Sequence, residues 1–483
     1  MKRQSIKANF IYNMMFQVLN ILLPLITTPY ISRILGAANI GIYSYTYSMI
    51  STFVMVGSLG IGTYGQREIS TSGDSKRRIS TTFWEIQIVK TISVSIVCLG
   101  YTFFAIAYKE YSIYLLAQLP YFLAAILDIS WLYQGLENFK YVAVRNIIVK
   151  ILSLILIFSF VKSAEDLLWY LVILWGAQLV GNAIMWRQIP EVVGKPHVQF
   201  KHLGKHIRPV FVYFIPTISY QIYAVLDKAM LGFIGNDISE NGYYEQAHKL
   251  VNMVTVVITS YTVVMRSRMT VYFSQNNIEK IKEHLSSSLH FIGLLIFPMT
   301  FGLAALASNI VPWFFGDGYS KIIILLVIFS PFLIVHSFGS YIGTHILTPS
   351  GQQGKSNIGQ CAAAGMNVIL NSLLIPSLGS TGAAIASVFA ECIIVVFYIY
   401  FSKQYLSIKW VAGTVWKYFI CAFGMFCVLK IIVPILPSTI IGSCVGVMLG
   451  MMVYFIELLF VRDRYFTQIV VNTINSVKKK YKM

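Results

Sequence analysis

Apolar runs of roughly 20 residues alternate with short polar breaks along almost the whole chain, and no other feature restricts the fold as strongly. A helix needs about 20 apolar residues to cross a hydrocarbon core of about 30 Å. The pattern predicts an all-α polytopic membrane protein with about 14 transmembrane helices. We place these spans at residues 8–31, 39–64, 81–107, 112–135, 144–161, 167–187, 209–234, 242–265, 286–308, 320–347, 357–376, 380–401, 412–433 and 438–460.

The positive charges fall mainly in every second break. The chain has 37 Lys and Arg residues, and few of them lie in the breaks opposite the N-terminus: Arg33, Lys109, Lys162, Lys321 and Lys430. Loops rich in Lys and Arg are retained in the cytoplasm, so both termini are predicted to be cytoplasmic. Basic loops beside anionic lipid also account for the net charge of +18 without nucleic acid. The tail 462–483 is predicted to bind the membrane surface through Lys478, Lys479, Lys480 and Lys482.

Apparent nucleotide and metal motifs lack their structural context. The stretch Gly60–Gly65 spells G-x-G-x-x-G, but it ends an apolar span and no strand precedes it. Gly354–Ser356 resembles the end of a P-loop, yet Pro349 replaces the first glycine. No C-x-x-C occurs among the six cysteines. We therefore expect no cofactor, no metal and no catalytic residue, and we expect three histidines to be solvated in a loop: His197, His202 and His206.

Polar side chains recur along the first span. Asn9, Asn13, Gln17 and Asn20 follow one another at steps of four, four and three residues, which places them on one helix face. Hydrogen bonding between helices is one interpretation, and a water-filled lumen facing this stripe is the other. Asn13, Gln17 and Asn20 are candidate substrate-binding residues under the second interpretation.

Charged residues also persist inside spans, where each costs about 2.5–3.5 kcal/mol at the bilayer centre. Asp227 and Lys228 lie in the seventh span, and Glu245 lies at a similar depth at the start of the eighth. A local pair between Glu245 and Lys249 is the structural alternative to a functional role. The remaining members of this polar set are Lys90, Lys150, Tyr213, Tyr220, His248 and Glu391, of which Lys150 and Tyr220 are candidate substrate-binding residues. Mixed charges at matched depth indicate a hydrated central site for a large polar, anionic headgroup, because each unpaired buried hydroxyl costs roughly 1–3 kcal/mol.

Several segments resemble the oligosaccharide-lipid flippases of bacterial polysaccharide export, within the multidrug/oligosaccharidyl-lipid/polysaccharide exporter superfamily. The matching segments are 24–36 (PLITTPYISRILG) with 41–43 (GIY), 131–137 (WLYQGLE), 227–228 (DK) with Gly232, and 367–391. They extend from the first span to the twelfth, so the resemblance covers nearly the whole chain. One departure is Arg266-Ser267-Arg268, where the family pattern has a proline before the second arginine.

The resemblance implies a transporter of the bacterial cytoplasmic membrane rather than an enzyme. It implies an N-lobe at 1–200, a C-lobe at 201–408 around a central cavity, and two further spans at 409–461. The implied substrate is an undecaprenyl-diphosphate-linked oligosaccharide, and the implied partners are membrane lipids and the polysaccharide polymerase and export machinery. We expect four cations to meet the anionic head, namely Arg33, Lys150, Lys228 and Lys249. Three carboxylates are candidates for ion coupling: Asp227, Glu245 and Glu391.

Other functions remain open at this point. A multidrug antiporter of the same fold would favour a cavity dominated by carboxylates, whereas this chain retains lysines in its spans. A membrane polysaccharide polymerase is less favoured, because the outer breaks are short and no D-x-D occurs. A structural membrane subunit would tolerate uncharged residues at the buried charged positions. Without an ATPase domain, the driving force is either ion exchange or removal of the product outside.

Overall fold

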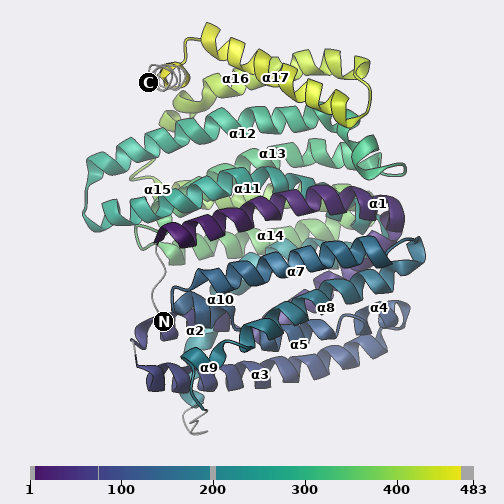
Figure 1. Cartoon of the computed structure of the whole chain (residues 1–483). Helices are drawn as coiled ribbons and strands as arrows, with labels where there is room; N and C mark the ends of the chain where they lie inside the picture. Colours follow the sequence, from purple (N-terminus) through teal and green to yellow (C-terminus); the bar gives the residue numbers. More distant parts are fainter. Residues whose placement is uncertain (1–5, 74, 196–202, 469–470, 472–483) are drawn as a thin grey trace, which may run out of the picture. The chain divides into compact units, whose positions relative to one another are not determined.

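The computed structural model describes residues 6–73, 75–195, 203–468 and 471, and the side chains of 6–21, 139 and 215–224 are outside that description. Every regular element within the described residues is helical. The chain forms two compact units, Met1–Glu245 and Gln246–Met483. Within each unit the long helices lie side by side with roughly aligned axes (Figure 1).

The first unit contains α1 to α10 and the first turns of α11. Their bounds are α1 Ile6–Ser58, α2 Ile61–Thr71, α3 Lys76–Ala107, α4 Ser112–Leu116, α5 Pro120–Leu127, α6 Ser130–Gly135, α7 Phe139–Phe160, α8 Leu167–Trp186, α9 Ile189–Val192, α10 Gly204–Ile234 and α11 Ser239–Ser274. The second unit continues from α11 into α12 Ile278–Phe315, α13 Lys321–Ile342, α14 Gln353–Leu378, α15 Ser380–Ser402, α16 Ile408–Ile432 and α17 Ile440–Phe460.

Eleven helical segments of the described chain are long and apolar enough to cross a membrane. The helices α1 and α10 cover the other predicted spans, because α1 bends at Gly36 into two segments. Gly36 has φ 74° and ψ 170°, a backbone region open essentially to glycine alone. The polytopic all-α fold is therefore confirmed.

Large apolar side chains remain exposed on the helices, as a lipid-facing surface requires. Leu99 is 74% exposed, Phe103 79% and Phe460 82%. Patches of this kind are rare on soluble monomers, whereas lipid tails solvate them readily. These residues lie on helices that meet the length and apolarity needed to span a bilayer. The chain is thus a multi-pass membrane protein.

The predicted second span is wrong at its end. We expected it to run to residue 64, but α1 ends at Ser58 and a turn follows, in which Leu59 has φ 49°. Two of the three glycines of the G-x-G-x-x-G stretch, Gly60 and Gly65, have packing roles here. A Cβ on Gly60 would lie 2.5 Å from the Tyr213 backbone, and one on Gly65 would lie 2.5 Å from the ring of Trp131. Close helix approach explains this motif without a nucleotide.

The helix α10 packs on α1, α2 and α3 within the first unit. The core there is built around Phe83, Trp131 and Tyr133 together with Ile86 and Val210, all nearly inaccessible to solvent. In the second unit, α15 packs between α13 and α14, and α12 contacts α13, α16 and α17. The lobe boundaries at residues 200, 408 and 461 stay predictions, and most of the basic tail lies outside the described residues.

Candidate functional site

Two glycines allow α1 and α11 to approach as closely as their backbones permit. A Cβ on Gly41 would lie 2.0 Å from the carbonyl oxygen of Ile238, and one on Gly242 would lie 2.0 Å from that of Ala37. A third glycine, Gly232 of α10, lies against the ring of Tyr45. There is no room for side chains at these contacts, and three residues beyond Gly41 and Gly242 the side chains of Ser44 and Glu245 are hydrogen-bonded across the interface.

The buried charges of α10 and α11 meet at this interface. The Lys228 ammonium lies 2.5 Å from a carboxylate oxygen of Glu245, and the side chains of these two residues are only 13% and 7% exposed. Ser44 of α1 donates a hydrogen bond to the same oxygen of Glu245 at 3.2 Å. The Tyr244 hydroxyl donates to Asp227 at 2.6 Å. The structure therefore brings together Asp227, Lys228 and Glu245, and Glu245 has Lys228 as a partner from another helix.

A series of aromatic rings begins beside this pair. Tyr43 contacts Tyr170 edge-on at 5.2 Å and stacks with Tyr47 at 5.8 Å. Tyr47 stacks with Trp175 at 5.5 Å, and Trp175 stacks with Tyr121 at 4.2 Å. Tyr47 lies within electrostatic range of Lys228 and Glu245, and Tyr121 lies within range of Asp128. We call these five rings the aromatic track, and it connects the charged pair to a second polar cluster.

That second cluster forms where a membrane span is broken. The segment Lys109–Gly135 meets the requirements for a span, yet α5 ends at Leu127 and α6 begins at Ser130. Irregular backbone at membrane depth needs partners from the protein for its polar groups. Side-chain donors meet four carbonyl oxygens near the break: Asn182 to Ala124 at 2.7 Å, Gln87 to Ile126 at 2.7 Å, Trp186 to Leu127 at 2.8 Å and Lys90 to Asp128 at 2.6 Å.

The break carries one carboxylate and two cations. Asp128 accepts the Ser130 N–H at 2.9 Å and lies 3.7 Å from the Arg145 guanidinium. Arg145 also donates to Asn182 at 2.7 Å. Lys90 is 6% exposed and Arg145 7%, whereas the Asp128 side chain is 35% exposed. With ordinary charges, this cluster has one positive charge in excess.

Sequence reasoning missed two members of this cluster. Asp128 was not selected, although a lone acidic residue in an apolar span is a signal that could have found it. Arg145 stands at the start of the predicted span 144–161 and was counted with the cytoplasmic charges rather than with the site; in the structure it lies within α7 and is buried. Its partners Asp128 and Asn182 come from other helices, so spacing along the chain carried no sign of the contact.

The expected solvated state of His206 is also wrong. His206 is 3% exposed, and its ring nitrogens lie 2.7 Å from the Tyr64 hydroxyl and 2.9 Å from Glu85. Lys205 lies 2.8 Å from the same Glu85 oxygen. This contact joins the start of α10 to α2 and α3. The other two histidines of the loop, His197 and His202, lie outside the described residues.

The remaining predicted site residues have different surroundings. Arg33 is exposed, three residues before the bend of α1, and Lys150 on α7 is half-buried. In the second unit Lys249 is half-buried, and Glu391 lies 2.7 Å from the His336 ring. Four predicted side chains lie outside the described residues: Asn13, Gln17, Asn20 and Tyr220.

The first unit thus holds two charged clusters joined by rings. Asp227, Lys228 and Glu245 carry one negative charge in excess, and the cluster at Asp128 carries one positive charge in excess. Such an arrangement can hold a cation at one end and attract an anion at the other, while the ring faces offer apolar surface between them.

The family model described as "Polysaccharide biosynthesis protein" matches residues 6–266, which is more than half of the chain. The chain belongs to this family. The resemblance found in the sequence is therefore confirmed at the level of the family.

Two curated relatives of this polysaccharide biosynthesis protein match it over most of their length. The putative O-antigen transporter of Escherichia coli (strain K12) is 24% identical over 81% of this chain and 95% of its own. The probable low-salt glycan biosynthesis flippase Agl15 of Haloferax volcanii is 24% identical over 88% of this chain and 89% of its own. These relatives are described as a transporter and a flippase.

Solved structures show the same fold. A lipid II flippase MurJ in an inward closed conformation superposes with a TM-score of 0.76 at 17% identity, covering 94% of this chain and 99% of its own. An inward-facing multidrug resistance MATE family transporter of the MOP superfamily gives a TM-score of 0.61 at 13% identity, covering 84% of this chain and 98% of its own. At these identities the likeness establishes the fold alone.

Proposed function

We propose that this protein is a flippase that moves an undecaprenyl-diphosphate-linked oligosaccharide repeat unit from the inner to the outer leaflet of the cytoplasmic membrane by alternating access. Family membership and the transporter and flippase relatives support a role in polysaccharide biosynthesis. The observation that carries the proposal is the aromatic track between two buried charged clusters in a membrane-spanning unit.

The track has the chemistry that a sugar headgroup needs. Sugar rings present C–H faces that pack on aromatic rings, and hydroxyl groups that need hydrogen-bond partners away from water. Tyr43, Tyr47 and Tyr121 are each only partly buried, so their surfaces are accessible to a ligand inside the unit. The excess positive charge at Lys90, Asp128 and Arg145 would attract a diphosphate or an acidic sugar.

The Lys228–Glu245 pair offers a way to couple transport to an ion. In this structure Glu245 neutralises Lys228. An anionic head that binds Lys228 must displace Glu245, which then needs a proton or another cation as its partner. Exchange of partners would therefore link substrate binding to ion binding. Asp227, held by Tyr244, is the second carboxylate in position to take part.

The proposal is tested by measuring which membrane leaflet holds the lipid-linked sugars in cells depleted of this protein. A flippase defect should leave complete undecaprenyl-linked repeat units in the inner leaflet, and the wild-type gene should restore export. Unpolymerised units in the outer leaflet would instead indicate a polymerase. No accumulation in either leaflet would contradict the proposal and favour a drug antiporter, which would be checked by efflux of cationic dyes.

A further inference from the structure

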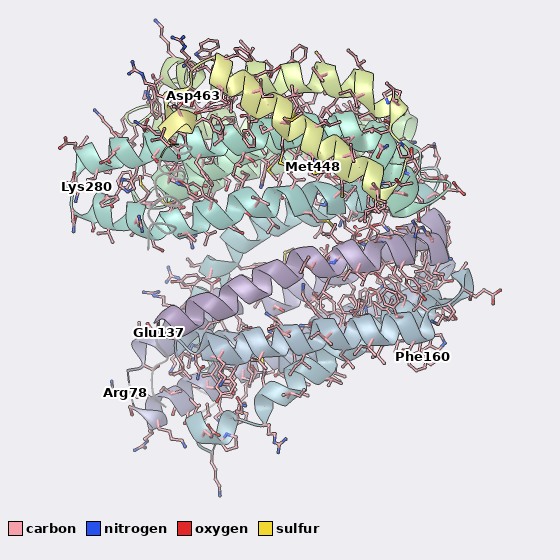
Figure 2. All side chains as sticks on the ribbon, turned by 45° about the horizontal axis from the view of Figure 1, so that its top comes forward. Arg78, Glu137, Phe160, Lys280, Met448 and Asp463 are labelled. Carbon is pink, nitrogen blue, oxygen red and sulfur yellow. The ribbon has the colours of Figure 1, made fainter. Side chains whose placement is uncertain are left out.

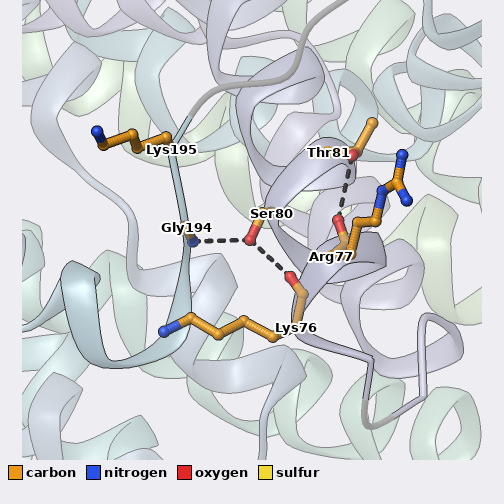
Figure 3. Close-up of a pocket in the computed structure, with 6 residues that line it drawn as sticks. All are labelled: Lys76, Arg77, Ser80, Thr81, Gly194 and Lys195. Carbon is orange, nitrogen blue, oxygen red and sulfur yellow. Dashed lines mark hydrogen bonds between the residues drawn. The ribbon is translucent and has the colours of Figure 1, made fainter.

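A pocket separate from the aromatic track lies at the N-terminal end of α3 (Figure 3). Its walls are Lys76, Arg77, Ser80 and Thr81 from the first turns of α3, with Gly194 and Lys195 from the segment after α9. The pocket is an open hollow with a volume of about 450 Å³. A volume of this size exceeds that of a single phosphate group and leaves room for a polar headgroup.

Two hydrogen bonds between α3 and Gly194 hold the segment that forms the other wall of the pocket. The Trp84 indole N–H donates to the Gly194 carbonyl at 3.0 Å, and the Gly194 N–H donates to the Ser80 hydroxyl at 2.7 Å. The preceding Val193 is 3% exposed and belongs to the core. Both backbone polar groups of Gly194 are therefore bound, so the non-helical segment that carries Lys195 has a defined position beside α3.

Two of the three cations at the pocket have no carboxylate partner within the described part of the chain. Lys76 donates to the carbonyls of Pro190 and Glu191 at 3.0 and 3.3 Å, which occupies its ammonium at the end of α9. For Arg77 and Lys195, no acidic side chain of the described residues forms an ion pair. Figure 3 shows these two side chains on opposite sides of the Gly194–Ser80 contact.

The helix N-terminus adds further donors. Ser75 is the N-cap of α3, and its side chain makes no capping hydrogen bond. No hydrogen bond from a described side chain reaches the first N–H groups of this long helix, and the positive end of the helix dipole lies at the pocket. The helix N-terminus, two cations without an ion-pair partner among the described residues, and the hollow between them together offer the chemistry of an anion site.

We propose that this pocket binds the phosphate of an anionic lipid headgroup at the membrane surface. The pocket lies at the end of a membrane-spanning helix, on the side that the charge pattern assigns to the cytoplasm, where headgroup phosphates lie at the same level. Trp84, half-buried beneath Gly194, is typical of side chains at this interface. The same phosphate chemistry occurs in phosphatidylglycerol and in the diphosphate of an isoprenoid carrier lipid.

Native mass spectrometry of the purified full-length protein, titrated with phosphatidylglycerol or phosphatidylcholine, tests the site. Arg77→Gln/Lys195→Gln should weaken phosphatidylglycerol binding about tenfold, since each cation near an anionic lipid surface contributes to attraction. Lys280→Gln/Lys282→Gln is the matched control. These lysines lie at the start of α12, whose N-terminus is capped by Asn277, and the control should change binding less than twofold.

Competition with undecaprenyl diphosphate identifies the source of the phosphate. If undecaprenyl diphosphate displaces the phosphatidylglycerol whose binding depends on Arg77 and Lys195, the site belongs to the carrier lipid. If that phosphatidylglycerol stays bound, the site belongs to phospholipid. Unchanged phosphatidylglycerol binding in the pocket variant, or an equal loss in the control, would overturn the proposal. If the double variant does not fold, Lys195→Gln alone carries the test. Because the readout is binding, the result stands whether or not the protein proves to be a flippase.

Discussion

The ion pair between Lys228 and Glu245 is costly for a protein to maintain inside its membrane-spanning part. Removing two charges from water costs several kcal/mol per ion, and a well-packed apolar pair is often as stable or more stable. Ser44 donates a hydrogen bond to Glu245, which offsets part of that cost. Structural stability therefore gives a weak reason for these charges, and a role in binding or ion exchange gives a stronger one.

Single and paired neutral variants separate these two roles. Lys228→Met or Glu245→Gln should each lower the free energy of unfolding by about 3 kcal/mol, because each leaves one buried charge without its partner. The double variant should regain most of that stability and still fail to restore polymer export in depleted cells. Thermal unfolding in detergent and an export assay provide the two readouts. Normal export by the double variant would refute a transport role for the pair.

Close packing of helices positions the Lys228–Glu245 pair. Gly41 and Gly242, where α1 crosses the start of α11, determine how closely these two helices approach. Gly41→Ala should lower the free energy of unfolding by about 1–3 kcal/mol and reduce export, since its Cβ would overlap the Ile238 carbonyl oxygen and push α11 away from Ser44. Gly62→Ala is the control, because no atom lies within 4 Å of its Cβ. Equal melting temperatures for the two variants would contradict this prediction, because they would show that α1 and α11 can move apart without loss of stability.

The broken span between α5 and α6 depends on donors from other helices. Lys90→Met should lower the free energy of unfolding by about 1–3 kcal/mol, because the Asp128 carbonyl would lose its partner inside the membrane and the carboxylate would lose a nearby cation. Thr91→Val is the control, since this hydroxyl bonds only within α3, to Gln87. Hydrogen exchange at the amides of residues 124–130 should increase in Lys90→Met and not in the control.

At the scale of the whole chain, the apolar runs were enough to predict the membrane-spanning helices, because the bilayer imposes a length and an apolar composition on each one. The break at Asp128 could not be predicted in this way. No proline or glycine marks it, and it is stabilised by Gln87, Lys90 and Trp186, which are distant in sequence. The burial of Arg145 and His206 escaped prediction for the same reason, since only partners on other helices make it tolerable.

The charge pattern makes a prediction about the orientation of the whole molecule. Figure 2 shows Arg78 and Glu137 at one end of the first unit and Phe160 at the other, as expected if alternate breaks share a side. Within the second unit, considered by itself, Lys280 and Asp463 lie toward one end of that unit. Loops rich in Lys and Arg stay in the cytoplasm, so the breaks near Arg78, Glu137 and Lys280 should be cytoplasmic, and the break at Lys162 should be external.

Alkaline phosphatase fusions measure this orientation, because the enzyme is active only outside the cytoplasm. A fusion after Ser163 should be active, whereas fusions after Gly73 and Asn276 should be inactive. Green fluorescent protein fused at the same three positions should give the opposite pattern and control for expression. Replacing Arg77 and Arg78 with Gln should weaken the bias only slightly, because Arg67 and Lys76 remain in the same break. Phosphatase activity after Gly73 together with inactivity after Ser163 would invert the topology, and would place the pocket at α3 against the outer leaflet instead.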